Sequence, residues 1–273
     1  MTSSKIKPGS LKIDVMQGAG EERTEQYERG IAKEHRSPKH SSTRFSAKRF
    51  AVFDVDGTVF RSSLLIELVE ELIEAGIFDE AIRDQYAREK EFWLDRKAAY
   101  YGYIDKVVEA FMENIRGVKF IELQGAGERV VDRLKDRLYT YTRDMLPELK
   151  KEGYFLLAVS NSPKLVLDEF CKRLGFDKVY GRIYEVGPEN RFTGKVEDLH
   201  LIANKVNILK RAAEKEGLVF EGSIGVGDTE GDISMLEMVE RPICFNPSRE
   251  LYKTAKRLGW KVVVERKDMV YEL

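Results

Sequence analysis

Two acidic residues, Asp54 and Asp56, stand at the end of a short apolar run and are followed by Gly57 and Thr58. Side chains two residues apart in an extended segment share a face, so both carboxylates can reach one reacting group. In isolation the same residues also fit an ordinary turn, because Asp and Gly are common turn residues. The rest of the chain must decide between these interpretations.

Two later apolar runs also end in polar residues. Ser160 follows the run 154–159, and Asp228 follows the run 223–226, with Asp232 four residues further on. In open α/β sheets, ligands bind in the crevice at the carboxyl ends of the strands. We therefore expect these residues to share one site with Asp54 and Asp56.

A site that collects four carboxylates repels itself unless a hard cation neutralises it, and oxygen ligands alone favour Mg²⁺. Magnesium held by carboxylates usually shares a phosphate group, and the chain offers phosphate binders. Ser162 and Pro163 are suited to begin a helix, whose free N–H groups would face an anion. Lys205 is predicted in the first turn of a later helix, and Lys195 and Lys210 are the competing lysines.

The elements that must position these residues follow from the apolar runs. The runs 50–53, 154–159 and 223–226 are nearly continuous in apolar residues, as buried parallel strands are, and 242–245 and 261–264 are candidates for two more. Helical patterns lie between them, so the sequence predicts an open, Rossmann-like parallel sheet between two layers of helices. A hairpin is expected over 181–186 and 192–195.

The first two strands are separated by a long helical segment. Apolar spacing predicts helices that begin near Leu65 and others over 80–95, 101–115 and 127–141. We expect residues 61–141 to form an inserted helical cap and residues 48–60 with 142–273 to form the core. The aromatic residues Trp93, Tyr100, Tyr101 and Tyr103 are interpreted as packing within the cap. Residues 1–47, rich in Ser, Lys, Glu and Gly, are predicted to be a disordered tail.

Composition excludes several classes of protein. The chain has 273 residues, of which 42% are hydrophobic and 34% charged, which suits a folded protein with a sizeable core. Two cysteines are too few for a disulfide framework, and no apolar run reaches membrane-spanning length, so a cytoplasmic location is expected. The first 49 residues carry a net charge of +5 and the remainder −6. Neither value points to a nucleic-acid partner.

Together these motifs resemble those of the haloacid dehalogenase superfamily, over residues 48–273. Its four motifs are matched in order, and the chain is most similar to the phosphoserine-phosphatase-like subgroup, whose C1-type cap follows the first motif. The matching segments are Asp54-Val55-Asp56-Gly57-Thr58-Val59, Ser160, Lys205 and Gly227-Asp228-Thr229-Glu230-Gly231-Asp232.

The resemblance implies a role for each matched residue. Asp54 would form an aspartyl-phosphate, and Asp56 would act as the general acid and base. Thr58, Ser160, Asn161 and Lys205 would bind the phosphoryl group. Mg²⁺ would be held by Asp54, the carbonyl of Asp56, Asp228 and Asp232. Asp232 would either bind the ion directly or hold one of the groups that bind it.

The resemblance favours a phosphatase acting on a small phosphomonoester, because Asp56 supplies the acid that dehalogenases and P-type ATPases lack. Phosphoserine is not the expected substrate, since Ser63 stands where those phosphatases carry a cap glutamate. Arg61 and Ser63 are predicted to contact the substrate. A phosphomutase remains an alternative, as does a non-catalytic binding scaffold with a basic tail, and the sequence says nothing of oligomeric state.

Overall fold

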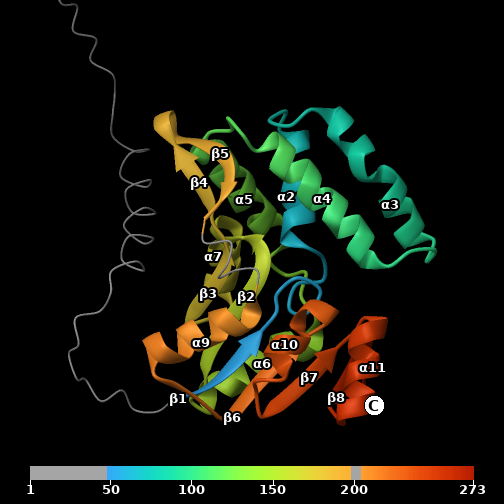
Figure 1. Cartoon of the computed structure of the whole chain (residues 1–273), viewed down its shortest axis with the longest axis vertical. Coiled ribbons are helices and arrows are strands. Elements are labelled where there is room, and N and C mark those ends of the chain that lie inside the picture. The colour runs from blue at the N-terminus through green and yellow to red at the C-terminus, as the bar shows by residue number, and fades with distance from the viewer. Residues whose placement is uncertain (1–47, 198–203) are drawn as a thin grey trace, which may run out of the picture. The chain divides into compact units, whose positions relative to one another are not determined.

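The computed structural model describes residues 48–197 and 204–273, so the predicted tail lies outside the described residues. Its main sheet has seven strands in the order β3-β2-β1-β6-β7-β8-β9 (Figure 1). The strands are β1 Lys48–Phe53, β2 Phe155–Pro163, β3 Lys178–Arg182, β6 Leu218–Gly227, β7 Arg241–Phe245, β8 Lys261–Arg266 and β9 Met269–Glu272. All neighbouring pairs are parallel except β8 and β9. The predicted open α/β sheet is thereby confirmed, and the antiparallel edge strand β9 was not predicted.

Helices lie both between the later strands and in the long segment inserted after β1. They are α2 Leu64–Glu74, α3 Asp84–Leu94, α4 Tyr100–Asn114, α5 Phe120–Leu134, α6 Thr140–Lys151, α7 Lys164–Arg173, α9 Lys205–Glu216, α10 Ile233–Leu236 and α11 Arg249–Leu258, with short 3₁₀ turns η1 Glu80–Arg83, η2 Pro188–Asn190 and η3 Glu230–Asp232. Within the described ranges, no helix is long and apolar enough to cross a membrane.

The alternation of side chains along β1 gives the sheet two buried faces. Phe50 and Val52 pack in a core cluster with apolar residues of α9, α10 and α11. Phe53, one residue on, meets the ring of Phe176, and α6 and α7 pack on β2. Because both faces are covered, β1 is entirely buried from Phe50 onward and its carboxyl end is held in a fixed place.

Helices α2 to α5 lie together on the side of the sheet toward which β1 points (Figure 1). The expected helix over 127–141 is wrong, because that segment holds the end of α5, a turn and the start of α6. Gly127 does not begin a helix but lies inside α5, where a Cβ would approach Val166 of α7 to 2.8 Å. The glycine marks a close contact between two helices rather than a boundary.

The predicted hairpin is present as β4 Tyr184–Gly187 and β5 Arg191–Val196, while Gly181 belongs to β3 of the main sheet. The hairpin is joined to the helical segment by backbone hydrogen bonds, with Gly117 N–H donating to the carbonyl of Phe192 and Phe192 N–H to that of Val118. The rings of Phe120 and Phe192 lie 6.1 Å apart. A segment that follows β3 in sequence is therefore packed against helices that precede β2.

Candidate active site

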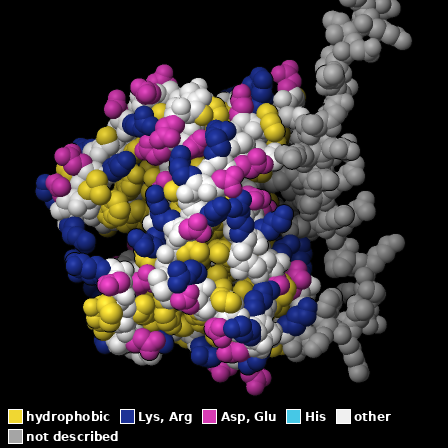
Figure 2. Space-filling view, turned by 180° about the vertical axis from the view of Figure 1, so that it is seen from behind, with side chains coloured by type: hydrophobic (Ala, Val, Ile, Leu, Met, Phe, Trp, Pro, Cys, Tyr) yellow, Lys and Arg dark blue, Asp and Glu magenta, His cyan; other side chains and the backbone are white. Residues whose placement is uncertain are grey.

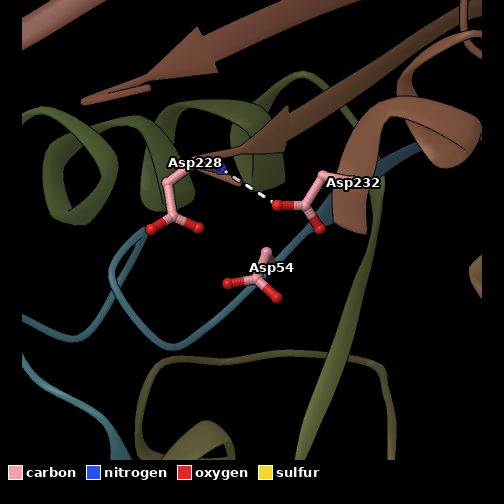
Figure 3. A group of neighbouring side chains, drawn as sticks. All are labelled: Asp54, Asp228 and Asp232. Carbon is pink, nitrogen blue, oxygen red and sulfur yellow. Dashed lines mark hydrogen bonds between the residues drawn. The ribbon is translucent and has the colours of Figure 1, made fainter. Parts of the chain in front are cut away.

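Three acidic side chains meet at the carboxyl edge of the sheet. Asp54 directly follows β1, Asp228 directly follows β6, and Asp232 ends the short turn η3. Each offers a carboxylate oxygen, and these oxygens lie within 4.8 Å of one another (Figure 3). Since β1 and β6 are parallel neighbours, the acids that follow them are brought to one place, as expected from the sequence.

A single buried lysine lies among these acids. Lys205 is the first residue of α9, and its Nζ is 2.5 Å from Oδ1 of Asp54 and 2.5 Å from Oδ1 of Asp232. Its side chain is 9% exposed, whereas Lys195 and Lys210 are exposed. Of the three lysines considered in the sequence, Lys205 is thus the one that contacts the acidic cluster.

Asp232 is completely buried and has both oxygens occupied. Its Oδ2 accepts hydrogen bonds from the backbone N–H groups of Asp228, at 3.1 Å, and Thr229, at 3.0 Å, and Oδ1 faces Lys205. The bond to Asp228 is the dashed line in Figure 3. These contacts fix the position of Lys205 relative to the loop after β6.

Asp228 lacks a cationic partner within ion-pair distance among the residues that the structure describes. Its Oδ1 accepts a hydrogen bond of 3.2 Å from Oγ1 of Thr58, and burial raises its pKa well above the ordinary value. Its Oδ2 lies where a Cβ on Gly57 would stand, and Gly57 has φ +82°. Only a residue without a side chain lets the turn after β1 come this close to Asp228.

The charge of the cluster fits a divalent cation. One lysine faces three carboxylates, and burial raises the pKa of Asp54 to about 8, with Asp232 and Asp56 adding to the rise and Lys205 opposing it. Three carboxylates beside one lysine leave a net negative charge that a divalent cation would neutralise. Because all the donors are oxygens, Mg²⁺ suits the cluster better than zinc.

Asp56 is held by three hydrogen bonds. Its Oδ1 accepts from the N–H of Leu64 at the start of α2, at 2.6 Å. Its Oδ2 accepts from the hydroxyls of Ser160, at 2.5 Å, and Ser162, at 2.8 Å. Burial raises the pKa of Asp56, and the hydrogen bonds from Ser160, Leu64 and Ser162 oppose that rise.

The prediction that Ser162 caps a helix is wrong. Strand β2 continues through Pro163, and α7 begins at Lys164 without a side-chain cap. The extended backbone turns the Ser162 hydroxyl toward Asp56 instead. This residue is therefore part of the site, and sequence reasoning missed its contact.

The other predicted site residues differ in exposure. Thr58 is buried and contacts Asp228, whereas Asn161 is exposed on β2. Ser63 is buried and lines a cavity beside the cluster together with Arg61. The guanidinium of Arg61 lies 5.9 Å from the centre of the Tyr139 ring.

Sequence reasoning missed most of that cavity. It is bounded by the helical segment on one side and by the loops after β1, β6 and β7 on the other. The residues that were not predicted are Ser62, Ile66, Glu67, Glu70, Lys90, Tyr139, Thr229, Asn246 and Ser248. The aromatic residues Trp93, Tyr100 and Tyr103, interpreted as packing, also line the cavity. Asn246 and Ser248 follow β7, so the rule that found the other strand ends could have found them.

Comparisons with known proteins agree with this arrangement. The chain is 29% identical over 216 residues to a phosphoserine phosphatase of Archaeoglobus fulgidus, covering 78% of this chain but 57% of that relative. It is 23% identical to a histidinol-phosphatase of Neisseria meningitidis, covering 79% of this chain and 98% of the relative.

Solved structures share the fold. A protein of Bordetella pertussis Tohama I matches with a TM-score of 0.63 and 19% identity, over 80% of this chain and 98% of its own. An aspartyl-phosphate analogue of phosphoserine phosphatase matches with a TM-score of 0.55 and 22% identity, over 82% and 96%. The model of the haloacid dehalogenase-like hydrolase family matches residues 51–237, about two thirds of the chain. The chain therefore belongs to the haloacid dehalogenase-like hydrolase family.

Proposed function

We propose that the chain is a Mg²⁺-dependent phosphomonoester hydrolase that works through an aspartyl-phosphate on Asp54. The observation that carries the proposal is the meeting of Asp54, Asp228 and Asp232 around the buried Lys205, beside the carboxyl of Asp56, which three hydrogen bonds hold in place. Such a site combines a nucleophile, a general acid and charge stabilisation, which are the three requirements of phosphoryl transfer through a covalent intermediate.

In the first step, a carboxylate oxygen of Asp54 attacks the phosphorus, and the bond from phosphorus to the ester oxygen breaks. Asp56 gives its proton to the departing oxygen, which leaves as an alcohol. Thr58 contacts Asp228, Ser160 contacts Asp56 and Lys205 contacts Asp54, and these three residues donate hydrogen bonds to the phosphoryl oxygens as charge moves onto them.

In the second step, Asp56 takes a proton from a water molecule that attacks the phosphorus. The bond between phosphorus and Asp54 breaks, inorganic phosphate leaves, and Asp54 is again a free carboxylate. Splitting one displacement into two makes each easier. Ser162 holds Asp56 in the same orientation for both proton transfers.

Mg²⁺ held by Asp54, Asp228 and the carbonyl of Asp56 would shield the attacking carboxylate from the negative charge of the substrate. Asp232, with both oxygens occupied, positions Asp228 and Lys205 in this proposal. Residues 61–141 serve as a cap over a core made of 48–60 and 142–273. The cap excludes water from the labile acyl-phosphate.

The substrate is proposed to be a small phosphorylated metabolite other than phosphoserine. Relatives named phosphoserine phosphatase and histidinol-phosphatase support phosphomonoesters as a class. Ser63, which by the resemblance stands where phosphoserine phosphatases carry a cap glutamate, lines the cavity. Arg61, at the same cavity, is proposed as a further substrate contact.

The test is hydrolysis of 4-nitrophenyl phosphate with Mg²⁺, together with mass spectrometry of acid-quenched protein. The wild type should release phosphate and carry a phosphoryl group during turnover. Asp54→Asn should lose both, and excess chelator should abolish turnover. Asp144→Asn, which changes an exposed carboxylate far along the chain, should behave as the wild type. Turnover by Asp54→Asn at the wild-type rate would refute the mechanism.

A further inference from the structure

The cavity beside the acidic cluster is large compared with the phosphoryl group alone. It has a volume of about 500 Å³, and Gly57 and Asp228 form part of its lining. A bound phosphomonoester would therefore place its phosphoryl group at the acids and its alcohol part in the rest of the cavity. The walls of that remaining space decide which alcohols fit.

One wall consists of aromatic rings from α3 and α4. The rings of Trp93 and Tyr103 are stacked, with centres 5.6 Å apart and planes 21° apart. Tyr100 packs edge-on against Trp93, with centres 5.3 Å apart. We call these three residues the aromatic wall.

Trp93 is not covered by its neighbours. Tyr103 is 2% exposed, but Trp93 remains 37% exposed although its ring lines a concave surface. Leaving an indole in water at such a place forgoes hydrophobic stabilisation that a flat ligand would supply. Figure 2 shows, from behind, a hollow between the helical segment and the sheet, with hydrophobic side chains on its upper side.

Tyr100 connects the aromatic wall to the phosphoryl site. It lines the same cavity as Ser63, Gly57 and Asp228, and burial with the nearby charges of Asp56 and Asp228 raises its pKa. The ring of Tyr100 thus stays neutral, contacts the indole of Trp93 and shares a cavity with Asp228. The cavity that reaches the phosphoryl site is therefore also lined by the aromatic wall.

The charged residues of the cavity outside the acidic cluster balance one another. Glu70 lies 3.6 Å from Lys90, and Glu67 lies 2.9 Å from the exposed Arg137, while Arg61 stands over Tyr139. The carboxylates of Glu67 and Glu70 thus each form an ion pair with a basic side chain. The cavity therefore offers ring surface rather than a strong net charge to the leaving group.

We propose that the preferred substrate is a phosphomonoester whose alcohol part carries a planar ring, and that Trp93 determines this specificity by stacking on the ring. This inference rests on the proposed phosphatase function and narrows its substrate class. It also accounts for the large cavity, which a short aliphatic alcohol would leave mostly filled with water.

The kinetic test compares benzyl phosphate with propyl phosphate and cyclohexylmethyl phosphate, whose alcohols have similar leaving ability. The wild type should prefer benzyl phosphate by about tenfold or more in kcat/KM, as expected for ring stacking in a water-excluded site. Trp93→Ala should lose that preference, because the KM for benzyl phosphate should rise about tenfold more than the KM for propyl phosphate. Leu94→Ala, which alters the exposed neighbour on the same helix, is the matched control.

Equal rates for benzyl and propyl phosphate in the wild type would overturn the inference while leaving the phosphatase function intact. Equal loss on both substrates in Trp93→Ala would also overturn it. Equal preference for the benzyl and cyclohexylmethyl esters would show that size rather than planarity is selected, which contradicts stacking.

A binding measurement decides the question without turnover. The chain has two tryptophans, so Trp260→Phe leaves Trp93 as the sole indole. With Mg²⁺ present, benzylphosphonate should change the fluorescence of Trp93 and bind about tenfold more tightly than methylphosphonate. No spectral change and no difference in affinity would refute the ring site, whether or not any ester is hydrolysed.

Discussion

Replacing Lys205 by Met is expected to destabilise the protein, because it leaves the buried carboxylates of Asp54 and Asp232 without their positively charged partner. Lys205 lies 2.5 Å from both Asp54 and Asp232, and all three side chains are nine-tenths or more buried. Two unit charges about 4 Å apart attract by about 4 kcal/mol at an effective dielectric constant of 20. Part of this attraction is offset by desolvation, and removing one member of a buried ion pair typically costs about 3–5 kcal/mol.

Lys205→Met should therefore lower the free energy of unfolding by about 3–5 kcal/mol in metal-free protein. Urea unfolding followed by circular dichroism in excess chelator, at a pH above the Asp54 pKa of about 8 so that this carboxylate is charged in the wild type, measures the loss. Lys210→Met, on the exposed side of the same helix, should change it by less than about 0.5 kcal/mol. The double variant Lys205→Met with Asp54→Asn should be more stable than Lys205→Met alone, because one uncompensated carboxylate is gone.

Mg²⁺ should restore more stability to Lys205→Met than to the wild type, because a bound cation replaces the missing positive charge. A loss in Lys205→Met no larger than that in Lys210→Met would refute the reasoning. So would a double variant less stable than the single one, since the effect would then come from packing rather than charge.

Three further predictions concern the turn after β1 and the acids around it. Asp56→Asn should lower kcat about 100-fold or more on alkyl phosphates by removing the proton donor, as stopped assays of phosphate release would show; a wild-type rate would exclude Asp56 as the acid. Gly57→Ala should abolish measurable turnover while lowering the free energy of unfolding by about 1–3 kcal/mol, because the new Cβ meets Asp228 at a positive φ; crystallography showing an unmoved Asp228 would contradict this. Burial raises the pKa of Asp54 from 3.8 to about 8, so the folded state binds the Asp54 proton more tightly than the unfolded state does. The stability that this bound proton contributes below about pH 4 should therefore be lost as pH rises to about 8. Unfolding of metal-free wild type and Asp54→Asn across that range should show a steeper fall in the wild type, and parallel curves would count against the shift.

The sheet and the acidic cluster could be predicted because both follow from local rules. Buried parallel strands are continuous apolar runs, and their carboxyl ends share one edge, so Asp54 and Asp228 could be brought together on paper. The orientation of Ser162 could not be predicted, because it depends on how far β2 extends before α7 begins. The helix boundary predicted at Gly127 was wrong for a related reason. This glycine is small because α5 packs closely against α7, a helix that lies far away in the sequence.

The aromatic wall depended on tertiary structure even more. Aromatic residues at helical spacing pack in most helices, and nothing in the sequence tells that Trp93 remains exposed while Tyr103 is buried. That difference arises only when α3 and α4 lie side by side over the loops of the sheet. The sequence could place the reacting groups, but the shape of the space for the alcohol required the fold.

The β4–β5 hairpin has a consequence for engineering by domain exchange. Its backbone is bonded to the segment 117–118, and Phe192 packs on Phe120, so the hairpin belongs physically with the inserted helices although it comes after β3. A chimaera that transplants residues 61–141 alone would remove the residues that Phe192 contacts. The transplanted helices would then be joined to the new core only by their two chain ends, without the hairpin contacts. The unit that recombination must move intact is thus discontinuous, made of the inserted helices and the hairpin 184–196 together.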